Sequence, residues 1–181
     1  MNPTTMALMA MFAALMTGAG WALALVPNLE FVTALAFLSG IRLGALRGLL
    51  TAVGGMFLFS ATNPLGSGLA YPILLASQLT AMGLTGIVGG WLGRFPLEFW
   101  ATAAGRATLA ATGFLLTVFY DGITSLSFPL FMGAPATEIW AVLVSGLLFS
   151  LLHQGANTVI FATLVPTLIR VVQPATSESV Q

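Results

Sequence analysis

The chain has 181 residues, of which 58% are apolar and only 6% are charged. A soluble domain carries roughly 25% charged residues, so this composition excludes a soluble protein and indicates an integral membrane protein. Arginine and lysine together number five and are balanced by five acids, which excludes the basic face that nucleic-acid binding requires. The lack of cysteine excludes disulfides, thiolate metal sites and cysteine nucleophiles.

The first apolar segment covers residues 5–25, close to the ~20 residues that a helix needs to span a bilayer. Pro27 ends this helix, because proline lacks a backbone N–H and biases the residue before it to an extended conformation. Residues 1–5 lack the basic start of a cleaved signal peptide. We therefore expect the first helix to be retained.

Two short apolar segments follow, at residues 31–41 and 48–60, on either side of Arg42 and Arg47. One interpretation joins residues 31–60 into a single broken span. That span would place both arginines at mid-bilayer, where charge is costly. We therefore favour two short helices folded against their neighbours, with a glycine-rich turn between them.

The rest of the chain alternates long apolar segments with loops rich in proline and glycine. The loops are predicted at residues 61–72 and 122–137, because proline and glycine interrupt regular structure there. Three helices are predicted at residues 71–92, 98–120 and 138–170, the last long enough to tilt or protrude. The chain thus reads as an all-α integral membrane protein with six transmembrane helices.

The charges predict the orientation of this bundle. Cytoplasmic loops of membrane proteins collect arginine and lysine, so we expect both termini to be cytoplasmic. This topology places four arginines on the inner side: Arg42, Arg47, Arg94 and Arg170. The fifth, Arg106, lies in the inner half of its helix. Three acids lie on the outer side: Glu30, Asp121 and Glu138. Residues 1–172 form one membrane domain, and the polar residues 173–181 are predicted to be a disordered cytoplasmic tail.

Four stretches together resemble the substrate-binding S components of energy-coupling factor (ECF) vitamin transporters. They are the turn Pro27–Thr33, the inner turn Gly40–Gly48, the stretch Phe119–Gly122, and the stretch His153–Phe161. The resemblance covers about residues 5–170 and rests on the order and spacing of these pieces. It implies a six-helix bundle in the cell membrane that captures a vitamin or related micronutrient on the outer side, under the loops after helices 1, 3 and 5.

The resemblance also implies partners. An S component has no ATPase and no cofactor of its own, and docks on a membrane coupling subunit driven by two cytoplasmic ATPase subunits. Docking in the family uses an Ala-x-x-x-Ala motif on the first helix, which Ala10 and Ala14 match here and Gly18 extends. Small residues at this spacing line one helical face and let another backbone approach closely. The alternative is that these residues pack against the protein's own helices.

The predicted substrate-binding residues are polar and aromatic side chains from five segments, expected at one depth in the outer half of helices 4, 5 and 6. Asn28 and Glu30 follow the first helix, and Glu30 could bind ligand or satisfy the free amides of the next helix. Gln78 lies two turns below the outer surface and needs a partner. The other members of this outer set are Asn63, Tyr71, Tyr120, Asp121 and Trp140.

His153 and Asn157 complete the predicted site. They belong to a polar stripe on the last helix, and polar groups inside a membrane mark functional sites by default. Counting residues places both toward the inner half, below the expected pocket. Interhelical hydrogen bonds that fix the bundle are therefore the alternative interpretation.

Two other functions fit parts of the pattern. A rhomboid-like intramembrane serine protease would need Ser67 within hydrogen-bond reach of His153, but helical rise puts them ~10 Å or more apart in depth. A stand-alone small-molecule facilitator is the second, although no chain of intramembrane acids relays ions. We expect a transport subunit and no enzyme. Riboflavin, thiamine, cobalamin, pantothenate and a queuosine precursor all remain candidate ligands, while Glu30 and Asp121 argue against one with several phosphates.

Overall fold

The computed structural model describes residues 2–173, and all regular structure in that range is helical. Four helices are long and apolar enough to cross a membrane: α1 (Pro3–Ala22), α4 (Pro72–Leu92), α5 (Ala103–Phe131) and α6 (Ala136–Thr163). The shorter helices are α2 (Val32–Leu43), α3 (Ala45–Ala61), η1 (Gly68–Ala70), η2 (Leu97–Ala101) and α7 (Val165–Val172). These lengths and compositions indicate a membrane-embedded protein. The predicted tail from residue 174 on lies outside the described residues.

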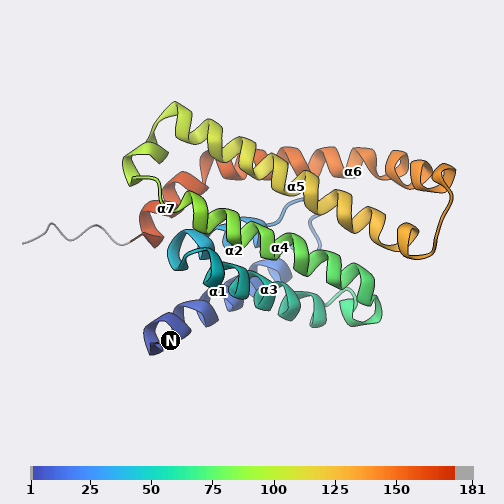
Figure 1. The fold of residues 1–181 in the computed structure, drawn as a ribbon, viewed down its shortest axis with the longest axis horizontal. Coiled ribbons are helices and arrows are strands. Elements are labelled where there is room, and N and C mark those ends of the chain that lie inside the picture. Colours follow the sequence, from blue (N-terminus) through green and yellow to red (C-terminus); the bar gives the residue numbers. More distant parts are fainter. Residues whose placement is uncertain (1, 174–181) are drawn as a thin grey trace, which may run out of the picture.

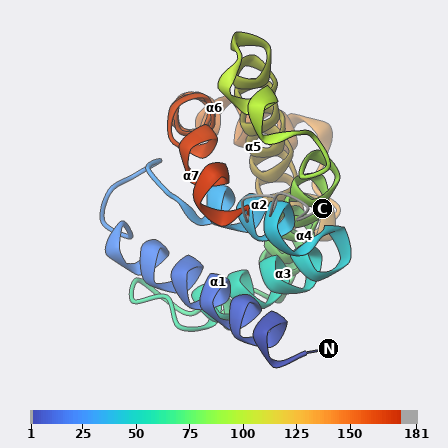
Figure 2. The same cartoon turned by 90° about the vertical axis from the view of Figure 1, so that its left-hand side faces the viewer.

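The helices form a bundle elongated along one axis, with α5 and α6 paired as a long antiparallel hairpin (Figure 1). Helix α2 lies near the centre, since nine of its twelve residues are buried. Phe37 of α2 packs against Phe161 of α6 with ring centroids 5.2 Å apart. On the side of the bundle shown in Figure 2, the loop from residue 23 to residue 31 lies between α1 and the helices α6 and α7.

Glycines bring α2, α3 and α4 into backbone contact. A Cβ atom added at Gly40 would lie 2.0 Å from the carbonyl oxygen of Gly86, and one at Gly86 would lie 2.4 Å from that of Gly48. A Cβ at Gly89 would lie 2.1 Å from the carbonyl oxygen of Phe37. These three helices thus pack closely at positions that admit no side chain, as is common for helices packed inside membranes.

The predicted pair of short helices is confirmed. Helix α2 ends and α3 begins at Gly44, whose φ of +84° lies in the region that favours glycine. The turn lets α3 fold back on α2, so Arg42 and Arg47 lie beside the turn. The alternative of one broken span through both segments is wrong.

Two predicted boundaries in the second half are wrong. Helix α5 does not stop at Asp121 but runs on to Phe131, so most of the predicted loop 122–137 is helical. Pro129 is tolerated because it lies two residues before the helix end and removes one hydrogen bond only. The long last helix is divided into α6 and α7, and Pro166 occupies the first turn of α7, where no N–H is needed.

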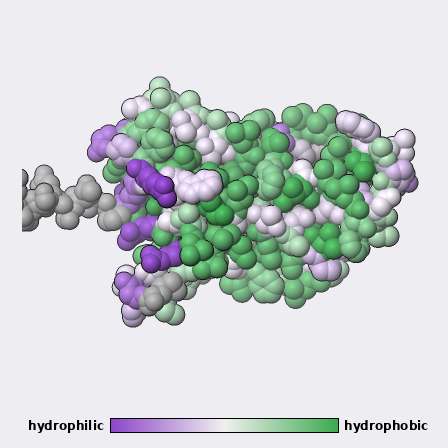
Figure 3. Space-filling view, in the orientation of Figure 1, coloured by the Kyte–Doolittle hydropathy of each residue, from purple (hydrophilic) through white to green (hydrophobic). Residues whose placement is uncertain are grey.

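All five arginines belong to segments at one end of the bundle. Hydrophilic surface gathers at that end in Figure 3, where the rest of the visible face is largely apolar. Figure 1 places the N-terminus, the α2–α3 turn, the α4–α5 connection and α7 at the same end. The arginines of these segments are Arg42, Arg47, Arg94, Arg106 and Arg170. One end of the molecule is therefore cationic, and the opposite end is not.

Candidate functional site

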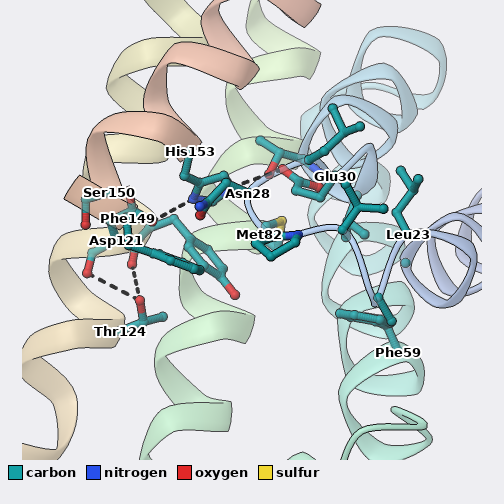
Figure 4. Close-up of a pocket in the computed structure, with 18 of the residues that line it drawn as sticks. Leu23, Asn28, Glu30, Phe59, Met82, Asp121, Thr124, Phe149, Ser150 and His153 are labelled. Carbon is teal, nitrogen blue, oxygen red and sulfur yellow. Dashed lines mark hydrogen bonds and ion pairs between the residues drawn. The ribbon is translucent and has the colours of Figure 1, made fainter. Parts of the chain in front are cut away.

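A cavity of about 360 Å³ lies between the α1–α2 loop and helices α3 to α6 (Figure 4). Its volume falls in the range of roughly 300–1,000 Å³ that is typical of small-molecule sites. The walls are mostly apolar, and the polar groups come from the loop, from α5 and from α6. The residues that form the apolar walls include Leu23, Met56, Phe59, Met82 and Phe149.

Glu30 links the α1–α2 loop to α2 and to α6. Its Oε2 accepts a hydrogen bond of 2.9 Å from the backbone N–H of Thr33, in the first turn of α2. Its Oε1 accepts one of 2.9 Å from Nδ2 of Asn157 and lies 3.6 Å from Nε2 of His153. Burial works to raise the pKa of the Glu30 carboxyl, but the contacts with His153 and Thr33 outweigh burial and lower this pKa. Glu30 is therefore ionised at neutral pH. It satisfies a free amide of α2, as one interpretation predicted, and it also lines the cavity.

His153 bridges Glu30 to Asp121 on the opposite side of the cavity. Its Nδ1 lies 2.8 Å from Oδ1 of Asp121. An ionised carboxylate only accepts hydrogen bonds, so Nδ1 is the donor. The second oxygen of Asp121 accepts a hydrogen bond of 3.3 Å from Gln154. Asp121 and His153 meet although they lie on antiparallel helices, because helical side chains lean toward the N-terminus of their own helix.

Two amide oxygens near Glu30 have no partner. Within the described residues, Oδ1 of Asn28 and Oδ1 of Asn157 are buried and accept no hydrogen bond. The orientation of the Asn157 amide is fixed, because its nitrogen must face the carboxylate of Glu30. Asn28 has a φ of +62°, a conformation that asparagine tolerates better than most residues. Of these two unpartnered oxygens, that of Asn28 belongs to a residue that lines the cavity.

The structure brings six of the ten predicted substrate-binding residues together. Five of them line the cavity: Asn28, Glu30, Tyr120, Asp121 and His153. Asn157 stands behind Glu30 and binds it directly. The sequence placed His153 and Asn157 below the expected pocket. This depth is wrong, because His153 lines the same cavity as Asp121 and Asn157 binds Glu30 at that cavity.

The other four predicted residues lie elsewhere. Gln78 accepts a hydrogen bond of 2.8 Å from Ser60 and so has its partner on α3. Asn63 binds the backbone of Leu65 in its own loop, and the side chain of Trp140 is 66% exposed. Tyr71 lines a separate apolar groove between the start of α4 and the end of α5. The cavity therefore lies against the α1–α2 loop rather than under the α3–α4 and α5–α6 connections.

Sequence reasoning missed the apolar walls and Gln154. Met82, Phe59 and Phe149 have the same character as lipid-facing side chains, so no sequence signal separates them from the surface. Gln154 neighbours His153 in the polar stripe of α6, and its amide could have drawn attention as a partner for an acid. The candidate protease serine, Ser67, donates to the carbonyl of Ala61 at 2.9 Å and does not line the cavity with His153.

The small residues of α1 face outward. Ala10, Ala14 and Gly18 are all exposed, and a Cβ at Gly18 would meet no atom within 4 Å. The alternative that this stripe packs against the protein's own helices is therefore wrong. An open face of small residues on α1 is available to another helix.

These features define a class: a helical, membrane-embedded protein with one acidic, mostly apolar-walled cavity inside the bundle. The chain matches no protein-family model, no curated protein and no solved structure. Its function is therefore argued from the cavity and from the distribution of charge.

Proposed function

We propose that the protein is the substrate-binding S component of an ECF-type importer, which captures a vitamin or related micronutrient on the outer side of the cell membrane. One observation carries the proposal. Glu30, Asp121 and His153, from three segments far apart in the sequence, converge on a cavity of small-molecule size inside an apolar bundle. Ionisable groups inside a membrane bundle are energetically costly, so they mark a functional site by default.

The proposed topology has six spans and cytoplasmic termini. It is supported by the gathering of all five arginines at the end that also holds the N-terminus and α7. The positive-inside rule assigns that end to the cytoplasm. The α5–α6 turn and the η1 loop, at the other end in Figure 1, then face outward.

The proposed partners are a membrane coupling subunit and two cytoplasmic ATPases. Support comes from the exposed stripe of Ala10, Ala14 and Gly18, where a partner helix could approach the backbone of α1. The chain itself has no nucleotide-binding loop in its sequence. Energy for uptake would then come from the partners.

The test is the identity of the bound compound. Protein purified in mild detergent is extracted with organic solvent, and the extract is analysed by mass spectrometry. We expect one small molecule to be retained by the wild type and by Glu138→Gln, a substitution of an exposed acid far from the cavity. Asp121→Asn should retain much less of it. Failure to find any compound that depends on the cavity would contradict a substrate-binding role.

A further inference from the structure

We propose that the ligand of this cavity is a cation: a flat apolar body that carries a protonated nitrogen, of the amidinium or amino-heteroaromatic class. The inference rests on the proposed function and specifies the chemistry of its substrate. It follows from the charge of the site, from the direction of its hydrogen bonds and from its walls.

The charge of the site is negative. Glu30 and Asp121 both line the cavity, and each accepts hydrogen bonds on both of its oxygens, as an ionised carboxylate does. His153 is the one basic group at the cavity. A protonated His153 offsets one of the two carboxylates, and a neutral His153 offsets neither. At least one negative charge therefore stays uncompensated in an apolar bundle.

No other side chain of the described residues supplies the missing positive charge. The only ion pairs among residues 2–173 are those of His153 with Glu30 and Asp121. The five arginines belong to segments at the cationic end of the bundle, and none of them lines the cavity. A buried charge without a partner is unfavourable, so a bound cation would relieve a cost that the empty site carries.

Hydrogen bonding favours the same kind of ligand. The buried oxygen of Asn28, which lines the cavity, has no donor among the described residues. The hydroxyl of Thr124, at the cavity, already donates to the backbone carbonyl of Tyr120 at 2.7 Å and so can only accept from a ligand. A ligand with N–H donors, such as an amidinium or amino-heteroaromatic group, would therefore satisfy acceptors that the protein leaves open at the cavity.

The walls select the rest of the ligand. Met82 and Phe59 stand at the cavity with Phe149 and Leu23, as Figure 4 shows. Sulfur and aromatic side chains favour flat, polarisable groups. A bare metal ion would leave these walls unused in a cavity of about 360 Å³. Among the described residues, no three His, Cys, Asp or Glu side chains are arranged so that they could hold a metal ion together.

The experiment compares three probes of nearly the same shape: benzamidine, which is cationic, benzamide, which is neutral, and benzoate, which is anionic. Their dissociation constants are measured by titration calorimetry on detergent-solubilised protein stripped of co-purifying compounds. We expect benzamidine to bind about tenfold or more tightly than benzamide, the size of one charge-assisted hydrogen bond, and benzoate to bind weakest. Glu30→Gln should abolish this preference, whereas Glu138→Gln should keep it.

Glu30→Gln preserves shape and can still accept from Thr33, and its melting temperature and circular dichroism report whether it folds. Asp121→Asn provides a second, independent removal of charge. If benzoate or benzamide binds as tightly as benzamidine, or if none of the three binds, the inference is overturned. The extraction experiment then decides the broader proposal. A neutral or anionic compound that depends on the cavity would support the binding function and reject only the cationic ligand. Failure to recover any such compound would reject both proposals.

Discussion

At the scale of single residues, His153 has the most consequential position. It contacts Asp121 at 2.8 Å and Glu30 at 3.6 Å, and so joins α5, α6 and the α1–α2 loop around the cavity. We predict that His153→Ala lowers ligand affinity by about tenfold, because Glu30 and Asp121 lose the side chain that holds them in position at the cavity. It should also lower the melting temperature, because two buried acids lose their shared partner.

Gln78 provides the comparison for that prediction. Its amide pairs with Ser60 on α3, and Gln78 itself does not line the cavity, so Gln78→Leu should lower the melting temperature and change affinity less than His153→Ala does. Both variants are measured by extraction of the co-purified compound and by thermal unfolding in detergent. A Gln78→Leu protein that loses its ligand while His153→Ala keeps it would place the binding site elsewhere.

At the scale of helices, the glycine contacts of α2, α3 and α4 set how closely these helices pack. Gly89→Ala would put a methyl group 2.1 Å from the carbonyl oxygen of Phe37, so the two backbones must separate. We predict that the free energy of unfolding falls by roughly 1–3 kcal/mol, as for other changes that overpack a core. Gly146→Ala in α6 meets no atom within 4 Å and should be neutral or stabilising by up to about 1 kcal/mol. Thermal unfolding distinguishes them, and equal melting temperatures would contradict the packing.

The exposed stripe on α1 gives a prediction about partners. Ala14→Trp adds a large side chain to an exposed face of α1, so folding and ligand retention should be unchanged. Binding to the proposed coupling subunit should be lost, because a partner helix can no longer approach. The measurement is co-purification of the ATPase subunits from the native host, with Leu147→Trp on an exposed position of α6 as the control. Loss of ligand together with the partners would show that α1 supports the cavity instead.

Sequence patterns predicted the helical fold better than the site, and the reasons are physical. The cost of placing Arg42 and Arg47 in lipid separated α2 from α3 correctly. The end of α5 was misplaced because Gly122 and Pro129 interrupt helices in water, whereas an apolar environment favours keeping backbone hydrogen bonds within the helix. Ending the helix at Asp121 placed that residue at the outer surface and so separated it in depth from His153, whereas α5 continues to Phe131. The pairing of Asn157 with Glu30, 127 positions apart, has no local signal.

At the scale of the whole molecule, the charge asymmetry predicts orientation. The chain has no natural cysteine, so single cysteines report position without background. Asn63→Cys, in the α3–α4 connection, and Thr137→Cys, in the first turn of α6, both lie away from the arginines and should react with a membrane-impermeant thiol reagent on intact cells. Arg94→Cys should react only after the membrane is opened. The reverse pattern would invert the topology and direct the cavity to the cytoplasm.

The position of the cavity also has a thermodynamic consequence. Helix α1 makes no backbone contact with α6 within the described residues, and the bundle of α1 to α4 meets the α5–α6 hairpin mainly along α4 and α5. The cavity occupies the space between these two halves, so a bound molecule would serve as the missing part of their shared core. Linkage then requires the ligand to raise the free energy of unfolding, by about 2.7 kcal/mol at a free concentration of 100 times Kd. The melting temperature of stripped protein should therefore climb steadily with added compound, and the supply of that compound would set which fraction of the protein is in the more stable, bound form.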